Sequence, residues 1–175
     1  MFKISKVLGN VAEETLRFFA QIGVEEVGIP ARLNDDVQLR PLVPSPQLKA
    51  PGLLPPMWDE AELQLIVARV RTFDLQPALM DLPLSGRILL GLEGRDEDLR
   101  NVEMQVQMAA RVGVDVLTYN FTALRASEGY AARERAGRGG AHLRDFDFAR
   151  IEGLPPLEDV GQHSQEQMWE RLTFF

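Results

Sequence analysis

The sequence predicts an α/β fold, a partial TIM (β/α) barrel of about four parallel βα units in one domain over residues 1–175. Three observations lead to this prediction. Helix-like and strand-like segments alternate along the chain, the joints from helix to strand are short, and the joints from strand to helix are long. In a parallel barrel the long joints lie at the end of the strands that carries the functional loops.

Four segments have apolar residues at helical spacing, and each begins with a helix start signal. Three of them have a pair with capping-box spacing: Asn10 with Glu13, Asp59 with Glu62, and Ser164 with Gln167. The remaining one begins with the acidic run 96–98, which favours the positive end of a helix dipole. The sequence therefore predicts four amphipathic helices, each packed through one face.

Short apolar runs rich in branched residues predict four strands. These runs are Lys3–Leu8, Val24–Ile29, Leu75–Leu82 and Val114–Phe121. A closed barrel has eight strands and about 250 residues, so four units correspond to its N-terminal half. A doubly wound sheet of four or five strands is the competing interpretation, but no GxGxxG or GxxxxGK[ST] turn follows any predicted strand.

Two long joints follow predicted strands, where a barrel places its active-site loops. Residues 30–58 form a Pro-rich loop, and residues 122–163 form a longer loop that contains glycine and arginine. Their composition predicts irregular structure rather than further regular elements.

Composition excludes several classes of function. A net charge of −7 argues against nucleic acid or an anionic membrane as a partner. The absence of cysteine excludes disulfides, thiolate metal sites and a cysteine nucleophile. With neither a signal peptide nor a membrane span evident in the sequence, we expect a cytoplasmic protein.

Four residues are candidates for substrate binding. Asn120 and Tyr119 lie at the predicted end of a strand, where an amide side chain can bind a substrate hydroxyl or carboxylate. Asp81 lies at the end of another strand and suits a base, or a group that supports a metal ligand. Arg138 lies among glycines and suits a substrate carboxylate. The structural alternatives are a strand-capping Asn, a loop-capping Asp and a solvated Arg.

Other polar and aromatic residues have stronger structural interpretations. His142 and His163 lack ligand spacing and are expected to be surface histidines. Trp58 and Arg32 suit the wall of a sugar pocket, although Trp58 equally suits packing beside the cap at Asp59. Ser85 and Ser127 lack the context of a nucleophile, and the acidic run 96–98 suits helix-end electrostatics rather than a metal cluster.

Several motifs, in order along most of the chain, resemble mannonate dehydratases of the xylose-isomerase-like barrel superfamily. They are Leu82-Pro83-Leu84, Gly94-Arg95-Asp96-Glu97, Ala109–Val114, Leu117–Phe121, Gly137–Ala141 with Phe146-Asp147, and Met168–Phe175. The resemblance implies a lyase that removes water from D-mannonate to give 2-keto-3-deoxy-D-gluconate, with Mn²⁺ or Fe²⁺ as cofactor. It also implies that the metal ligands lie in the C-terminal half of the barrel, so none is expected in this chain.

Two features depart from the family pattern. The chain has no cysteine, although the family uses one as a ligand, and Pro83 is followed by Leu84 and Ser85 where the family commonly has a His-Glu pair. Two alternatives therefore stay open: a sugar isomerase or epimerase of the same superfamily, and a non-catalytic half-barrel fragment. Half a barrel leaves two strand edges unpaired, so the partner is expected to be a second copy or a complementary half-barrel, besides a small sugar acid.

Overall fold

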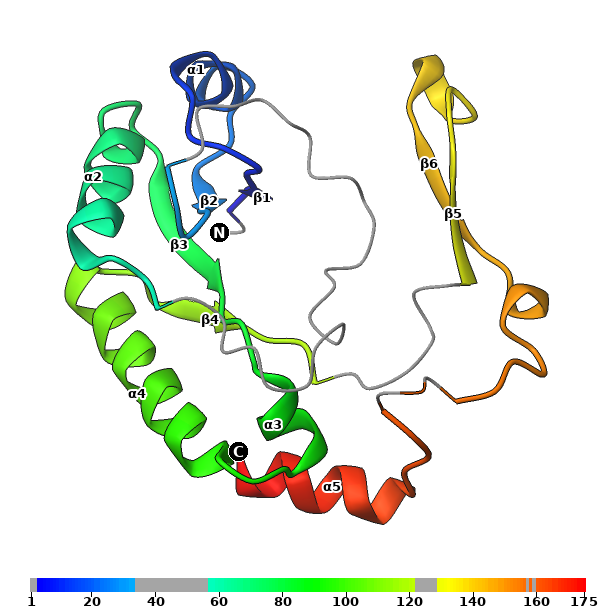
Figure 1. The fold of residues 1–175 in the computed structure, drawn as a ribbon. Helices are drawn as coiled ribbons and strands as arrows, with labels where there is room; N and C mark the ends of the chain where they lie inside the picture. Colours follow the sequence, from blue (N-terminus) through cyan, green and yellow to red (C-terminus); the bar gives the residue numbers. More distant parts are fainter. Residues whose placement is uncertain (1–2, 34–56, 122–128, 157, 159) are drawn as a thin grey trace.

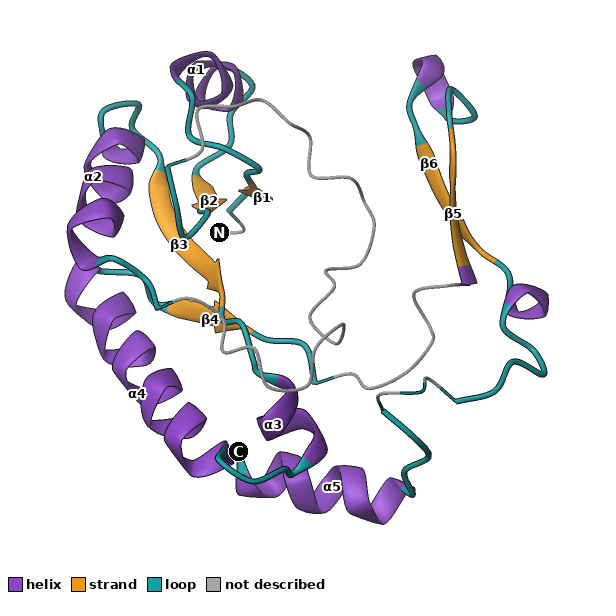
Figure 2. Ribbon diagram, in the orientation of Figure 1, coloured by secondary structure: helices purple, strands orange, loops and turns teal. Residues whose placement is uncertain are grey.

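The fold is α/β, as predicted. The computed structural model describes residues 3–33, 57–121, 129–156, 158 and 160–175 (Figure 1). Its elements alternate in the predicted order, although the strands are shorter than the apolar runs that predict them (Figure 2). Within this part of the chain, no helix has the length and apolarity needed to cross a bilayer.

A four-stranded parallel sheet forms the centre of the fold. It contains β1 (Ser5–Val7), β2 (Glu26–Gly28), β3 (Gln76–Asp81) and β4 (Val116–Thr118), paired in the order β1-β2-β3-β4. Adjacent strands of a (β/α) barrel have this sequential order, whereas a doubly wound sheet reverses its order at a switch point. No reversal occurs among the described strands, so the sheet favours the barrel interpretation.

The helices that connect the strands lie along one side of the sheet (Figure 1). They are α1 (Glu13–Gln21), α2 (Glu60–Arg71) and α4 (Arg95–Val112). Two more helices, α3 (Gly86–Leu90) and α5 (Gln165–Phe174), pack against each other near the start of α4. The five-residue α3 was not predicted, because it is too short to show a helical period.

The predicted start signals form in part. Ser164 and Gln167 make the complete capping box of α5, and Asp59 accepts a hydrogen bond from the Glu62 N–H at 2.9 Å. The Glu62 side chain does not complete that box, because it accepts from the Leu33 N–H at 2.6 Å and so fastens the segment after β2. The predicted cap at Asn10 is wrong, since Ala12 is the N-cap residue of α1.

The two faces of the sheet differ in burial. Val27 and Met80 point toward the helices and are completely buried. Residues paired across parallel strands share a face, and the row Val7, Gly28, Leu79 and Val116 points the other way. We call this second side of the sheet the inner face. Val7 is 56% exposed and Val116 is 47% exposed on it.

The segment 122–163, predicted as an irregular loop, contains a β-hairpin. Its antiparallel strands β5 (Tyr130–Arg133) and β6 (Leu143–Phe146) stand apart from the main sheet (Figure 1). We call residues 129–150 the arm. Residues 34–56, which make up most of the Pro-rich loop 30–58, lie outside the described residues, as do residues 122–128 with Ser127.

Candidate functional site

The carboxyl ends of β3 and β4 bring two polar side chains together on the inner face. Asp81 and Thr118 are the last residues of the two strands and are paired in register. The Thr118 Oγ1 donates a hydrogen bond to the Asp81 Oδ1 at 2.5 Å. This bond fixes the orientation of the carboxylate, and the Asp81 Oδ2 has no hydrogen-bond partner among the described residues. The pair therefore presents an oriented acceptor at the end of the sheet where barrels bind substrates.

Tyr119 and Asn120 continue from β4 at the same edge, so the chain brings three of the four candidate residues together. Both side chains are exposed. The centroid of the Phe175 ring lies 5.0 Å from that of Tyr119, in an edge-on arrangement, and 6.0 Å from that of Phe121. These contacts fasten the end of α5 beside the strand ends, so α5 helps to define this edge.

Sequence reasoning missed Thr118. The signal that identifies it is its position rather than its residue type, because Asp81 and Thr118 end two neighbouring strands. Parallel strands place their carboxyl ends at one edge of a sheet, so polar residues there meet.

Arg138 is not part of this edge. It lies in a short 3-10 turn, Arg138–Gly140, at the tip of the arm and is exposed. The following Gly139 and Gly140 have φ angles of 66° and 79°, which the turn requires and which L side chains rarely adopt. The glycines therefore shape the tip of the hairpin.

Arginines along the arm hold the hairpin together. Asp145 Oδ2 lies 2.8 Å from Arg133 and 3.3 Å from Arg150. The hydrogen bond from Arg150, assisted by the charge of Arg133, lowers the pKa of Asp145 below its ordinary value of 3.8. The Arg144 guanidinium lies over the Tyr130 ring, 3.9 Å from its centroid. These three arginines have structural partners within the arm.

The two histidines have different surroundings. His142 is exposed on the arm, as expected of a surface histidine. His163 differs from that expectation because it is partly buried against α5. Its Nδ1 accepts a hydrogen bond from Arg171 at 3.1 Å, since a guanidinium only donates. His163 therefore fixes the start of α5.

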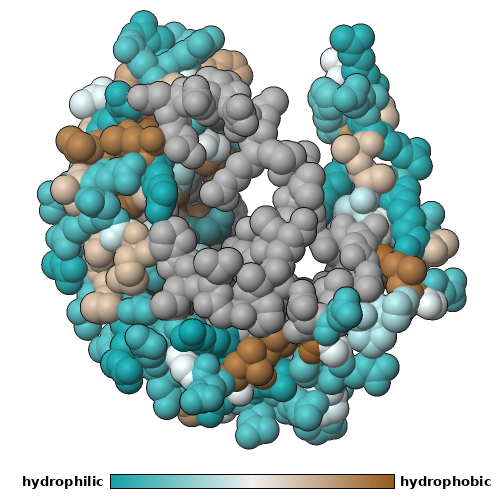
Figure 3. All heavy atoms as spheres, in the orientation of Figure 1, coloured by the Kyte–Doolittle hydropathy of each residue, from teal (hydrophilic) through white to brown (hydrophobic). Residues whose placement is uncertain are grey.

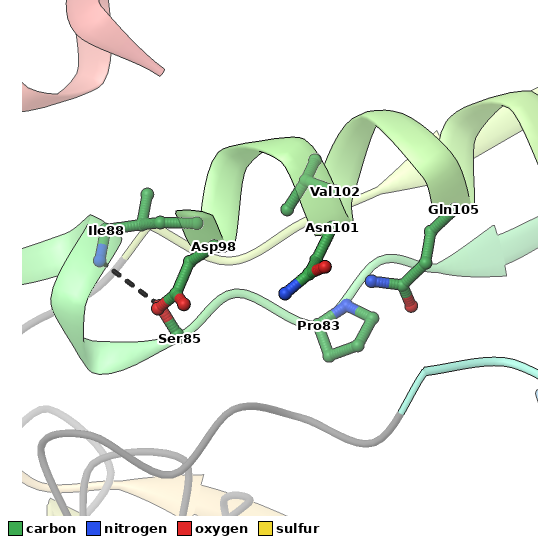
Figure 4. Close-up of a pocket in the computed structure, with 7 residues that line it drawn as sticks. All are labelled: Pro83, Ser85, Ile88, Asp98, Asn101, Val102 and Gln105. Atoms are coloured by element: carbon green, nitrogen blue, oxygen red, sulfur yellow. Dashed lines mark hydrogen bonds between the residues drawn. The ribbon is translucent and has the colours of Figure 1, made fainter. Parts of the chain in front are cut away.

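Ser85, the N-cap residue of α3, and Asp98, in the first turn of α4, form a buried polar pair (Figure 4). The Ser85 hydroxyl donates to Asp98 Oδ2 at 2.5 Å and accepts from the Ile88 N–H at 3.3 Å. Arg87 also donates to Asp98, at 3.4 Å. Asp98 therefore does more than complement the helix dipole: it fastens α3 to α4. Ser85 serves as a helix cap.

The small cavity beside this pair is not a substrate site. Pro83, Ser85, Asp98 and Gln105 are among its lining residues, and its volume of about 10 Å³ suits one water-sized group (Figure 4). Trp58 is 7% exposed and belongs to the hydrophobic core, which favours packing over a role in a sugar pocket. Arg32 is exposed.

The site defines a class of fold: a parallel sheet of consecutive βα units with polar groups at the carboxyl edge. One solved structure with this architecture is the crystal structure of mannonate dehydratase from Streptococcus suis serotype 2. The two structures superpose with a TM-score of 0.69 over 99% of this chain, at 17% sequence identity.

That alignment covers 48% of the mannonate dehydratase, so this chain spans about half the length of the protein it resembles. At this identity the likeness shows the fold alone. No family model matches the sequence, and no curated protein matches it.

Proposed function

We propose that this chain forms the substrate-side half of a barrel lyase that removes water from a sugar acid, with D-mannonate as the first candidate substrate. The observation that carries the proposal is the Asp81–Thr118 pair at the carboxyl edge of a sheet with sequential strand order. The likeness to the Streptococcus suis mannonate dehydratase supports it at the level of the fold.

The chemistry of the elimination assigns a task to Asp81. Removing water from a sugar acid requires a base for the proton beside the carboxylate and an acid for the departing hydroxyl. A carboxylate with one oxygen held by Thr118, and the other without a hydrogen-bond partner in the described part of the chain, suits the base, because its position is fixed before substrate arrives. Asn120, two residues beyond the end of β4, suits a substrate hydroxyl or carboxylate.

The residues described here do not fit the divalent metal that the resemblance implies. Nowhere in residues 3–33, 57–121, 129–156, 158 and 160–175 do three His, Cys, Asp or Glu side chains gather as a metal site requires. His163 is bonded to Arg171, and His142 lies on the arm. We therefore propose no step through a metal for these residues and expect any ligands for Mn²⁺ or Fe²⁺ to come from further βα units.

Product formation from D-mannonate in the presence of Mn²⁺ tests the proposal. The assay measures the 2-keto-3-deoxy acid formed by this chain and by the product of its complete reading frame. In an active protein, Asp81→Asn should lower kcat by about 10²–10⁴-fold. Glu14→Gln is the control, because Glu14 is an exposed carboxylate on the outer helix α1, and it should leave kcat unchanged.

Two outcomes would contradict the proposal. Absence of the keto acid from the complete reading-frame product would exclude the dehydratase assignment, and interconversion of ketoses without loss of water would favour a sugar isomerase or epimerase instead. If Asp81→Asn retains the parent kcat, Asp81 is not the base.

A further inference from the structure

A polar stripe on α4 faces the small buried cavity that separates this helix from the segment after β3 (Figure 4). The stripe consists of Asp98, Asn101 and Gln105, whose helical spacing places them on one face. Asp98 is 2% exposed and Gln105 is 1% exposed, so both side chains lie among the core residues of α4. Polar groups that are buried in this way need hydrogen-bond partners.

Gln105 differs from Asp98 in how its acceptor is matched. Ser85 and Arg87 donate to the two oxygens of Asp98. The Gln105 Oε1 is buried and has no hydrogen-bond partner in the described part of the chain. Across the cavity lies Pro83, which has no N–H to donate. The backbone at this residue therefore cannot satisfy the Gln105 amide.

The size and the charge of the cavity select its ligand. The volume of about 10 Å³ is the space that one water-sized group occupies. A hard cation of this size takes about six oxygen ligands or more, and the carboxylate of Asp98 already has the Arg87 guanidinium 3.4 Å away. The amides of Asn101 and Gln105 offer donors as well as acceptors. A neutral ligand that both donates and accepts hydrogen bonds fits these groups better than an ion.

We propose that the cavity is a binding site for a single water molecule that is held as part of the folded protein. The water donates a hydrogen bond to the Gln105 Oε1 and accepts one from the Asn101 amide. Buried waters of this kind satisfy polar groups that the protein leaves unmatched. The polar stripe of α4 is then satisfied along its whole length, which explains how a glutamine is accommodated in the core.

The water site lies against the segment that follows Asp81. The Leu82 N–H donates to the Thr118 carbonyl at 2.7 Å, and the Ser85 hydroxyl donates to Asp98. This segment is therefore fastened at both ends, to β4 and to α4, and the water fills the space between the two attachments. The proposal concerns a structural ligand and does not depend on the proposed function, since its tests detect water rather than catalysis.

A crystal structure of the 175-residue chain tests the proposal directly. We expect one ordered water at hydrogen-bond distance, about 2.7–3.2 Å, from the side chains of Gln105 and Asn101. An empty cavity would overturn the proposal. A density peak surrounded by about six oxygen atoms at about 2.3–2.6 Å would overturn it as well, because that geometry identifies a cation.

Magnetic relaxation dispersion of water nuclei tests the same site in solution, because it counts waters that stay bound for longer than the protein takes to tumble. Gln105→Met replaces the amide with an apolar chain of similar length and should lower this count by one. Gln107→Met is the matched control, since Gln107 is exposed on the same helix, and it should leave the count unchanged. Circular dichroism confirms that each variant is folded. An unchanged count in the folded Gln105→Met variant would overturn the proposal, and the crystal structure of the parent decides it if that variant does not fold.

Discussion

The two faces of the main sheet are made of similar residues but have different surroundings. On the outer face, Val27 and Met80 are completely buried beneath the helices. On the inner face, Val7 and Val116 are about half exposed. This chain therefore builds one of the two cores of a barrel by itself. The layer between the sheet and the helices forms from consecutive βα units, whereas the layer inside a barrel requires strands from opposite sides.

The largest expected loss of stability comes from a substitution on the outer face, which is then compared with one on the inner face. Met80→Ala should lower the free energy of unfolding by about 2–5 kcal/mol, because it leaves a cavity in a core that is already packed. This cost should not depend on protein concentration. Urea denaturation followed by circular dichroism measures it.

Val116→Ala is the counterpart on the inner face. It should change the free energy of unfolding by no more than about 0.5 kcal/mol, as expected for an exposed position. An equal loss of unfolding free energy at Met80 and Val116 would contradict the difference in packing between the two faces.

The outer layer was predictable because its signals are local. The apolar spacing of α2 and α4 and the caps at Asp59 and Ser164 depend on residues within one or two turns. The cap at Asn10 failed for a similar local reason. Asn10 accepts hydrogen bonds from the Ala12 N–H and the Thr15 hydroxyl, so it bonds to the start of α1 from two residues before the N-cap position.

The candidate site was predictable only in part. Asp81 and Asn120 could be identified because each lies near the end of an apolar run, but the pairing of Asp81 with Thr118 depends on strand register, which the sequence does not specify. The arm was missed because β5 and β6 are only four residues long each, and neither alternates apolar and polar side chains. The burial of Asp98 depends on Ser85, thirteen residues earlier, across an unpredicted helix.

A smaller effect should separate packed from open positions near the inner face. Gly28→Ala should cost about 1 kcal/mol, because its Cβ would meet Val7 and Leu79 at 3.0 Å and force both side chains to shift. Gly9→Ala is the control, since no atom lies within 4 Å of the added Cβ. It should be neutral or slightly stabilising. Equal stability of the two variants in urea would show that the row across Gly28 is not packed in solution.

The smallest effect should come from a surface ion pair that joins the outer helices. Arg111 on α4 donates to Glu60 on α2 at 2.8 Å, and this hydrogen bond lowers the pKa of Glu60 below its ordinary value of 4.5. A lowered folded-state pKa means that the contribution to stability is present above pH 4.5 and is lost as the pH falls through the folded value. Glu60→Gln should therefore be less stable than the parent at neutral pH, by a margin that disappears in acid. When Glu60→Gln is added to an Arg111→Gln variant, the loss of stability should show no such pH dependence. If the margin persists at low pH, the packing of Glu60 rather than its charge connects the two helices.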